Sequence, residues 1–190
     1  MKTKLLSLLF FLVVSNNYSQ SLETLKNETV NMYDASYNMD FETILDLTYP
    51  KIFDLVNRET MLSSLDNLFQ NKTMKVRFVY PKVTFTYSNI KEIEGAKFCV
   101  INYKNAMRIT FDEKLTQEKV AIFLKSMNDT KKYTTVQFET ERNSFFLEGN
   151  SILIAVSDKF SNNRWTFLNH DSGDFFVQIF SASIKKELGL

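Results

Sequence analysis

Apolar side chains in the first third of the chain recur every three or four positions, the spacing of a helix that buries one face. Asp40 and Asn57 are suited to cap a second and a third helix, because their side chains accept hydrogen bonds from the free amides of a first turn. Three helices are therefore predicted before residue 71. Their inward faces are Leu25, Thr29, Met32, Tyr33 and Ser36, then Phe41, Ile44 and Leu45, then Met61, Leu62, Leu65, Leu68 and Phe69.

From Met74 onward the spacing changes to two, which is typical of strands with one inward face. Met74, Val76 and Phe78 share one parity, and the next apolar residues, Val83, Phe85 and Tyr87, take the opposite parity. The strand must therefore bend or break near Tyr80-Pro81. A long strand is expected after Glu94-Gly95. The side chains that share one of its faces are Cys99, Ile101, Tyr103, Met107, Ile109 and Phe111. Further strands are expected at 133–139, 144–157 and 164–169.

One helix interrupts the strands and another closes the chain. Thr116 can cap a helix with the apolar face Val120, Phe123, Leu124 and Met127, and a final helix from about Asp174 carries Phe176, Ile179, Phe180, Ile184 and Leu188. Helices followed by hairpin-connected strands predict an α+β fold. We expect N-terminal helices packed on a curved antiparallel sheet forming a cone, with an inserted helix and a C-terminal helix.

The first residues are typical of a secretory signal peptide. Lys2 and Lys4 precede an apolar run from Leu5 to Val14, which only Ser7 interrupts, and a polar stretch follows. The run is too short to cross a bilayer. We assign residues 1–19 to the signal peptide and residues 20–190 to a single domain. We expect an exported protein, periplasmic or secreted, from a bacterium.

Composition and charge exclude several partners and chemistries. The chain has 23 Lys+Arg, 22 Asp+Glu and a formal net charge of +1, which becomes −1 when the signal peptide takes away Lys2 and Lys4. Such a chain has no electrostatic reason to bind nucleic acid, and we expect no membrane insertion after signal cleavage. One His, one Cys and four isolated Gly form no zinc site, disulfide or phosphate-binding loop, so we expect no metal and no cofactor.

Two segments carry a resemblance to a known family. Met32-Tyr33-Asp34-Ala35-Ser36-Tyr37-Asn38-Met39-Asp40-Phe41 is similar to a first helix that ends before an acidic residue and a short second helix. Arg164-Trp165-Thr166-Phe167-Leu168 is similar to a late strand of the same fold. With the order of elements, these segments resemble the nuclear transport factor 2-like superfamily, which includes ketosteroid isomerase, scytalone dehydratase and polyketide cyclases. The resemblance implies a homodimer that pairs through the outer sheet face.

The isomerase chemistry of that superfamily does not carry over to this chain. It requires an Asp base and an oxyanion hole made of a Tyr and a protonated Asp. Tyr33 lies near the position of the helical Tyr, but the position of the base falls at Val56. Glu148 is the only acid in the strand 144–157. We therefore assign no catalytic residue.

A curved sheet around a long helix leaves a pocket at its open end. We expect the ligand-binding residues that line this pocket to be Tyr33, Tyr37, Tyr103 and Trp165, because aromatic residues with polar tips are suited to such a site. The alternative is that these residues are part of the core, with hydroxyls bonded to the backbone.

Three functions follow from these observations. The first is an exported non-catalytic domain that binds a small apolar ligand or a protein partner. The second is a lyase- or isomerase-type enzyme that uses a buried carboxylate beside Tyr33 or Tyr37. The third is a self-associating envelope protein.

Overall fold

The computed structural model describes residues 22–170 and 175–190. The predicted signal peptide, residues 1–19, and the predicted start of the last helix at Asp174 lie outside the described residues. Three helices come first in the described part. They are an N-terminal helix whose described part covers residues 22–38, α2 at Phe41–Leu47 and α3 at Arg58–Phe69, with a short 3-10 helix, η1, at Pro50–Asp54.

Polar side chains set the starts of α2 and α3. The amide of Thr43 donates to Asp40 at 3.1 Å, and the amide of Thr60 donates to Asn57 at 2.8 Å. Each bond satisfies an amide of the first turn that has no partner inside the helix. The predicted caps at Asp40 and Asn57 are therefore confirmed.

The sheet that follows is built on two long antiparallel neighbours. Their register is unbroken from Lys97 opposite Ser157 to Thr110 opposite Ser144. Three short strands pair with one of them and two with the other, giving seven strands in the described part. The long strands are β4 at Ala96–Phe111 and β6 at Ser144–Ser157; β1 at Met74–Phe78, β2 at Phe85–Tyr87 and β3 at Lys91–Ile93 pair with β4, and β5 at Tyr133–Glu139 and β7 at Thr166–Asn169 pair with β6.

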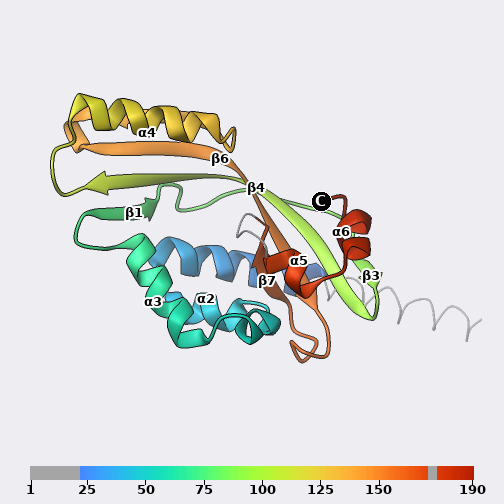
Figure 1. Ribbon diagram of the computed structural model, residues 1–190. Coiled ribbons are helices and arrows are strands. Elements are labelled where there is room, and N and C mark those ends of the chain that lie inside the picture. Colours follow the sequence, from blue (N-terminus) through green and yellow to red (C-terminus); the bar gives the residue numbers. More distant parts are fainter. Residues whose placement is uncertain (1–21, 171–174) are drawn as a thin grey trace, which may run out of the picture.

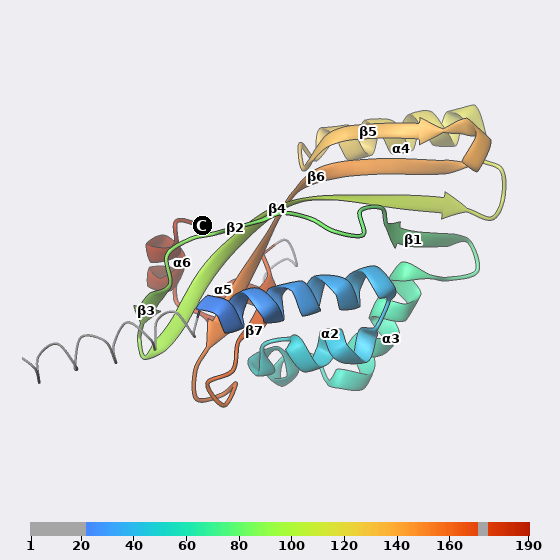
Figure 2. The same ribbon diagram turned by 180° about the vertical axis from the view of Figure 1, so that it is seen from behind.

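The sheet curves because β4 and β6 twist and change direction along their length (Figure 1). Seen from behind, the N-terminal helix, α2 and α3 lie together on the inner side of this curve (Figure 2). The predicted break after the first strand is confirmed, since β1 ends at Phe78 and β2 begins at Phe85. The α+β class and the curved antiparallel sheet are as predicted.

An inserted helix and two short C-terminal helices complete the fold. Helix α4, Gln117–Asp129, lies between β4 and β5 in the chain and is capped by Thr116, and a short 3-10 helix, η2 at Thr140–Arg142, joins β5 to β6. The predicted C-terminal helix is divided into α5, Phe175–Ile179, and α6, Ala182–Leu188. The division falls at Ser181, whose extended backbone and side chain, an acceptor for the Ile184 amide at 3.3 Å, start a new helix.

The two ends of the β4–β6 pair differ in packing. At the end that carries β2, β3 and β7, here called the packed end, both faces of the sheet are covered. One face packs on the N-terminal helix through Leu25, Cys99, Ile101, Ala155 and Phe167, and the other packs on α5 and α6 through Phe98, Ile154, Val156, Phe176 and Ile184. At the end that carries β1 and β5, here called the open end, the helices α3 and α4 contain no buried residue.

No helix among the described residues is both long and apolar enough to cross a membrane.

Candidate functional site

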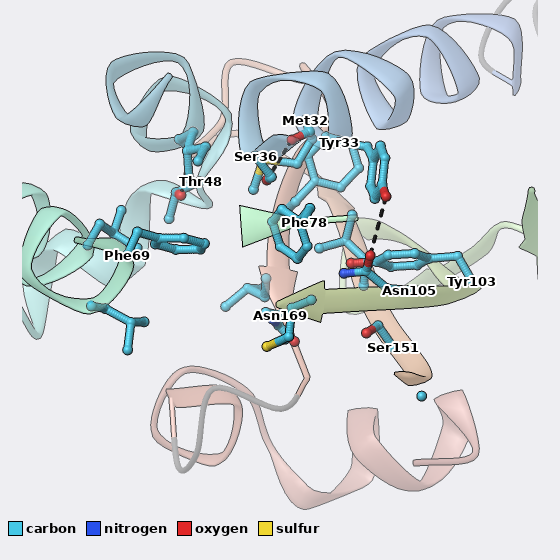
Figure 3. Close-up of a pocket in the computed structure, with 18 of the residues that line it drawn as sticks. Met32, Tyr33, Ser36, Thr48, Phe69, Phe78, Tyr103, Asn105, Ser151 and Asn169 are labelled. Atoms are coloured by element: carbon cyan, nitrogen blue, oxygen red, sulfur yellow. Dashed lines mark hydrogen bonds between the residues drawn. The ribbon is translucent and has the colours of Figure 1, made fainter. Parts of the chain in front are cut away.

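A cavity of about 570 Å³ lies between the inner face of the sheet and the N-terminal helices (Figure 3). Its lining is mainly apolar and comes from almost every element of the fold. The volume falls in the range of pockets that hold small organic molecules. The residues on its walls include Met32, Tyr33, Ile44, Met61, Leu65, Leu68, Phe69, Phe78, Phe85, Tyr103, Asn105, Met107, Tyr133, Leu147, Ser151, Leu153, Phe167 and Asn169.

Helix α3 forms the apolar wall of the cavity. Its predicted inward face includes Met61, Leu65, Leu68 and Phe69, and all four line the cavity. None of them is fully buried, and Leu68 is 57% exposed, because this face borders open space instead of a packed core. The ring of Phe69 lies 5.9 Å from that of Phe78, so aromatic contacts continue from α3 to the sheet.

The polar wall of the cavity lies opposite, on the N-terminal helix and the sheet. The hydroxyl of Tyr33 donates to the carbonyl of Tyr80 at 2.8 Å and lies 3.3 Å from Oδ1 of Asn105. The rings of Tyr33 and Tyr103 pack edge to face at 5.8 Å. Burial, and then the neighbouring Tyr103, raise the pKa of the Tyr33 hydroxyl, so it stays protonated at neutral pH.

The structure brings together two of the four predicted ligand-binding residues. Tyr33 and Tyr103 line the cavity and contact each other. Tyr37 lies one turn beyond Tyr33 and is half-buried, away from the cavity lining. Trp165 is buried in the core with Leu25 and borders a second, more polar cavity of about 500 Å³. The assignment of these residues to ligand binding stays a prediction.

Asn105 is a buried polar residue of the cavity wall that the sequence pattern did not single out. It lies on β4 at the same parity as Tyr103 and Met107, and it is 94% buried because its exposed fraction is 6%. An inward-facing strand that reads apolar at each alternate position is interrupted here by an amide. That interruption is the signal by which the residue could have been found.

The charged groups on the cavity wall are few. In the described part of the chain, the lining contains no Asp, Glu, His or Cys, and Lys132 is its one charged residue. A general acid or base must lie within hydrogen-bond reach of the substrate. Among the described residues, the ionisable groups on the cavity wall are therefore Lys132 and the tyrosines Tyr33, Tyr103 and Tyr133.

One buried carboxylate does contact a tyrosine, but outside both cavities. The hydroxyl of Tyr49 donates to Oδ2 of Asp158 at 2.6 Å, and the exposed fractions of the two residues are 1% and 7%. Oδ1 of Asp158 accepts from the amides of Phe160 and Ser161, at 2.8 and 3.0 Å. Neither Tyr49 nor Asp158 lines a cavity. The pair holds the turn after β6 against η1, a structural role.

Metal-binding and thiol chemistry have no group to support them in the described residues. No three His, Cys, Asp or Glu side chains gather there as a cation site. Cys99 is fully buried in the core, and burial raises the pKa of its thiol, which is the opposite of what a nucleophile requires.

No family model, curated protein or solved structure matches this chain. The fold itself defines the class: an α+β protein with three N-terminal helices and, within the described residues, a curved antiparallel sheet of seven strands. This arrangement is compatible with a nuclear transport factor 2-like fold.

Proposed function

We propose that this protein binds a small, mainly apolar molecule in the cavity between α3 and the sheet and does not transform it. The observation that carries the proposal is the cavity of about 570 Å³ with apolar walls. Burial of apolar surface contributes roughly 25 cal/mol for each Å² removed from water, so a ligand that fills these walls gains most of its affinity without any charged contact. The proposal includes export of the protein, which depends on the signal-peptide pattern in residues 1–19.

The composition of the lining favours binding over catalysis. A lyase or isomerase needs a group that exchanges a proton with its substrate. The described cavity wall offers Lys132, at an exposed position, and tyrosines, and the hydroxyl of Tyr33 already donates to a backbone carbonyl. Its raised pKa makes that hydroxyl a poor base at neutral pH.

A fluorescent apolar probe tests the proposal. N-phenyl-1-naphthylamine is dark in water and bright in apolar sites, so its titration reports occupancy of the cavity. We expect saturable binding to the purified chain, and we expect Ser151→Phe, which places a ring in the cavity, to weaken it about tenfold, or 1.4 kcal/mol.

The matched control is Ser126→Phe on α4, which is exposed and lies outside the lining. It adds the same ring to the surface and should leave the affinity unchanged. Circular dichroism confirms that both variants are folded. Absence of saturable binding to the unmodified chain, or equal affinities for all three proteins, would show that the cavity is not a ligand site.

A further inference from the structure

The amide of Asn105, a buried polar group on the cavity wall, is only partly paired among the described residues. Asn105 contacts Tyr33 through one edge of its amide, at 3.3 Å, and no described residue forms a hydrogen bond with the amide nitrogen Nδ2. This nitrogen is not among the buried polar atoms that lack a partner, so it borders open space. Because Asn105 is 94% buried and lines the cavity, that space is the cavity itself, and Figure 3 shows the amide facing its centre.

The strand register explains why no side chain of the neighbouring strand pairs with the Asn105 amide. Across β6 the residue opposite Asn105 is Gly149, which has no side chain that could pair with an amide. A Cβ at this glycine would lie 2.7 Å from the carbonyl oxygen of Lys132, so a larger residue does not fit. The backbone therefore keeps a side-chain-free position beside the amide of Asn105.

An open amide in an apolar cavity selects among ligands. In the free protein the amide can be hydrated, but an apolar ligand that fills the cavity removes that water. Leaving a buried polar group without a partner costs about 1–3 kcal/mol. A ligand with one matching polar group avoids this cost, and a pure hydrocarbon does not.

Resting on the proposed function, we infer that the ligand is an apolar molecule with one hydroxyl group, which pairs with Asn105 while the apolar body lies against α3. The hydroxyl of Tyr33 has one proton, and it donates that proton to the Tyr80 carbonyl at 2.8 Å. The contact between Tyr33 and Asn105 is therefore equally well made with the amide of Asn105 turned by 180°, so that the amide nitrogen donates to the Tyr33 oxygen. A hydroxyl both donates and accepts, and it therefore pairs with whichever edge of the amide faces the cavity.

Charge argues against two other ligand classes. A carboxylate would be buried in apolar surroundings whose one charged residue, among those described, is Lys132 at an exposed position. An ammonium group would find no carboxylate on the described wall. Burial of an unpaired ion costs far more than burial of a neutral hydroxyl.

The test compares matched probes on matched variants. The affinities of 2-naphthol, 2-methylnaphthalene and 2-methoxynaphthalene are measured by displacement of N-phenyl-1-naphthylamine from the unmodified chain, Asn105→Leu and Asn102→Leu. Asn102 lies on the same strand but is exposed, so Asn102→Leu controls for the substitution itself. The ratio of the naphthol and methylnaphthalene affinities is compared between variants, because the difference in solubility of the two probes is the same for every variant and cancels, as in a double-mutant cycle.

We expect Asn105→Leu to lower this ratio about five- to tenfold and Asn102→Leu to leave it unchanged. Because Tyr33 keeps its Tyr80 partner, Asn105→Leu should fold, and Asn105→Ala provides the same ratio if it does not. An unchanged ratio in the Asn105 variant, or tighter binding of 2-methoxynaphthalene than of 2-naphthol to the unmodified chain, would overturn the hydroxyl assignment. Binding of 2-methylnaphthalene would still support the proposed function in either case, and failure of every probe would remove both.

Discussion

The packed end and the open end of the β4–β6 pair use the same two strands for different purposes. At the packed end, Phe98 and Ile154 on one face and Cys99 and Ile101 on the other have exposed fractions of zero, because helices cover both faces. At the open end, α3 borders the cavity without burying any of its own residues. The difference teaches that unfilled space is kept where α3 faces the sheet, while the same end still buries Phe145, whose ring stacks on that of Phe123 of α4 at 3.9 Å.

The test with the largest expected effect removes one aromatic ring from each end. Phe98→Ala at the packed end should lower the free energy of unfolding by about 3–5 kcal/mol, because a fully buried ring leaves a cavity. Phe69→Ala on α3 should cost about 1 kcal/mol, since its ring is partly exposed and already borders open space. Urea denaturation followed by circular dichroism measures both. Equal losses would mean that the Phe69 ring is packed as tightly as the Phe98 ring.

A second test compares the two buried tyrosine hydroxyls. Tyr49→Phe removes the donor to Oδ2 of Asp158 and leaves a buried carboxylate oxygen without it, which should cost about 2–3 kcal/mol. Tyr33→Phe frees the Tyr80 carbonyl beside the cavity, where water can replace the lost donor, and should cost less than about 1 kcal/mol. Thermal unfolding of the two variants measures the difference. A larger loss for Tyr33→Phe would mean that the hydroxyl beside the cavity contributes more to stability than the Tyr49 hydroxyl at the packed end.

A third test uses two glycines with different surroundings. Gly149→Ala places a Cβ 2.7 Å from the Lys132 carbonyl oxygen and should cost about 1–2 kcal/mol while also changing probe binding, since both residues line the cavity. Gly95→Ala meets no atom within 4 Å but has a φ of +78°, so its cost of about 1 kcal/mol is conformational and should leave probe binding unchanged. Probe titration beside urea denaturation separates the two effects.

The smallest expected effect is electrostatic and comes from an ion pair on the solvent-facing side of the open end. Arg108 lies 2.6 Å from Glu139, and its hydrogen bond lowers the pKa of that carboxyl. A lowered folded-state pKa means that the stabilisation is complete above the ordinary Glu pKa of about 4.3 and is lost as the pH falls through the lowered value. Because the pair is partly exposed, its share is below about 1 kcal/mol.

The Glu139 prediction is checked by comparing Glu139→Gln with the unmodified chain at neutral and acidic pH. The stability difference should be present at pH 7 and shrink below pH 4, with the denaturation midpoints converging. A difference that stayed constant across this range would assign the effect of Glu139 to packing instead of charge.

The local features of the fold could be predicted because each depends on a few neighbouring residues. The caps at Asp40, Asn57 and Thr116 are all made by side chains that accept an amide three positions later. The break after β1 follows from the change of parity between Phe78 and Phe85. The division of the C-terminal helix was not predicted, because the apolar spacing continues through Ser181 and hides the cap.

The site was predictable only in part, because periodicity gives the direction of a side chain but not whether the space in front of it is filled. Tyr33 and Tyr103 were placed on inward faces by their spacing, and both line the cavity. Trp165 is instead buried in the core cluster that includes Leu25 and Phe167, outside the lining of the cavity. Whether the space in front of β4 is filled depends on how closely α3 approaches the strand. Because α3 is remote in sequence from β4, no local sequence pattern gives the distance between them.

The contact between Tyr49 and β7 has a consequence for how copies of this protein could associate. The Tyr49 amide donates to the Phe167 carbonyl at 3.0 Å, and Thr48 forms a parallel bridge with Phe167. Unpaired backbone groups at the margin of a sheet invite strand addition by another polypeptide. Residues 48 and 49 therefore block strand addition to β7 beside Phe167.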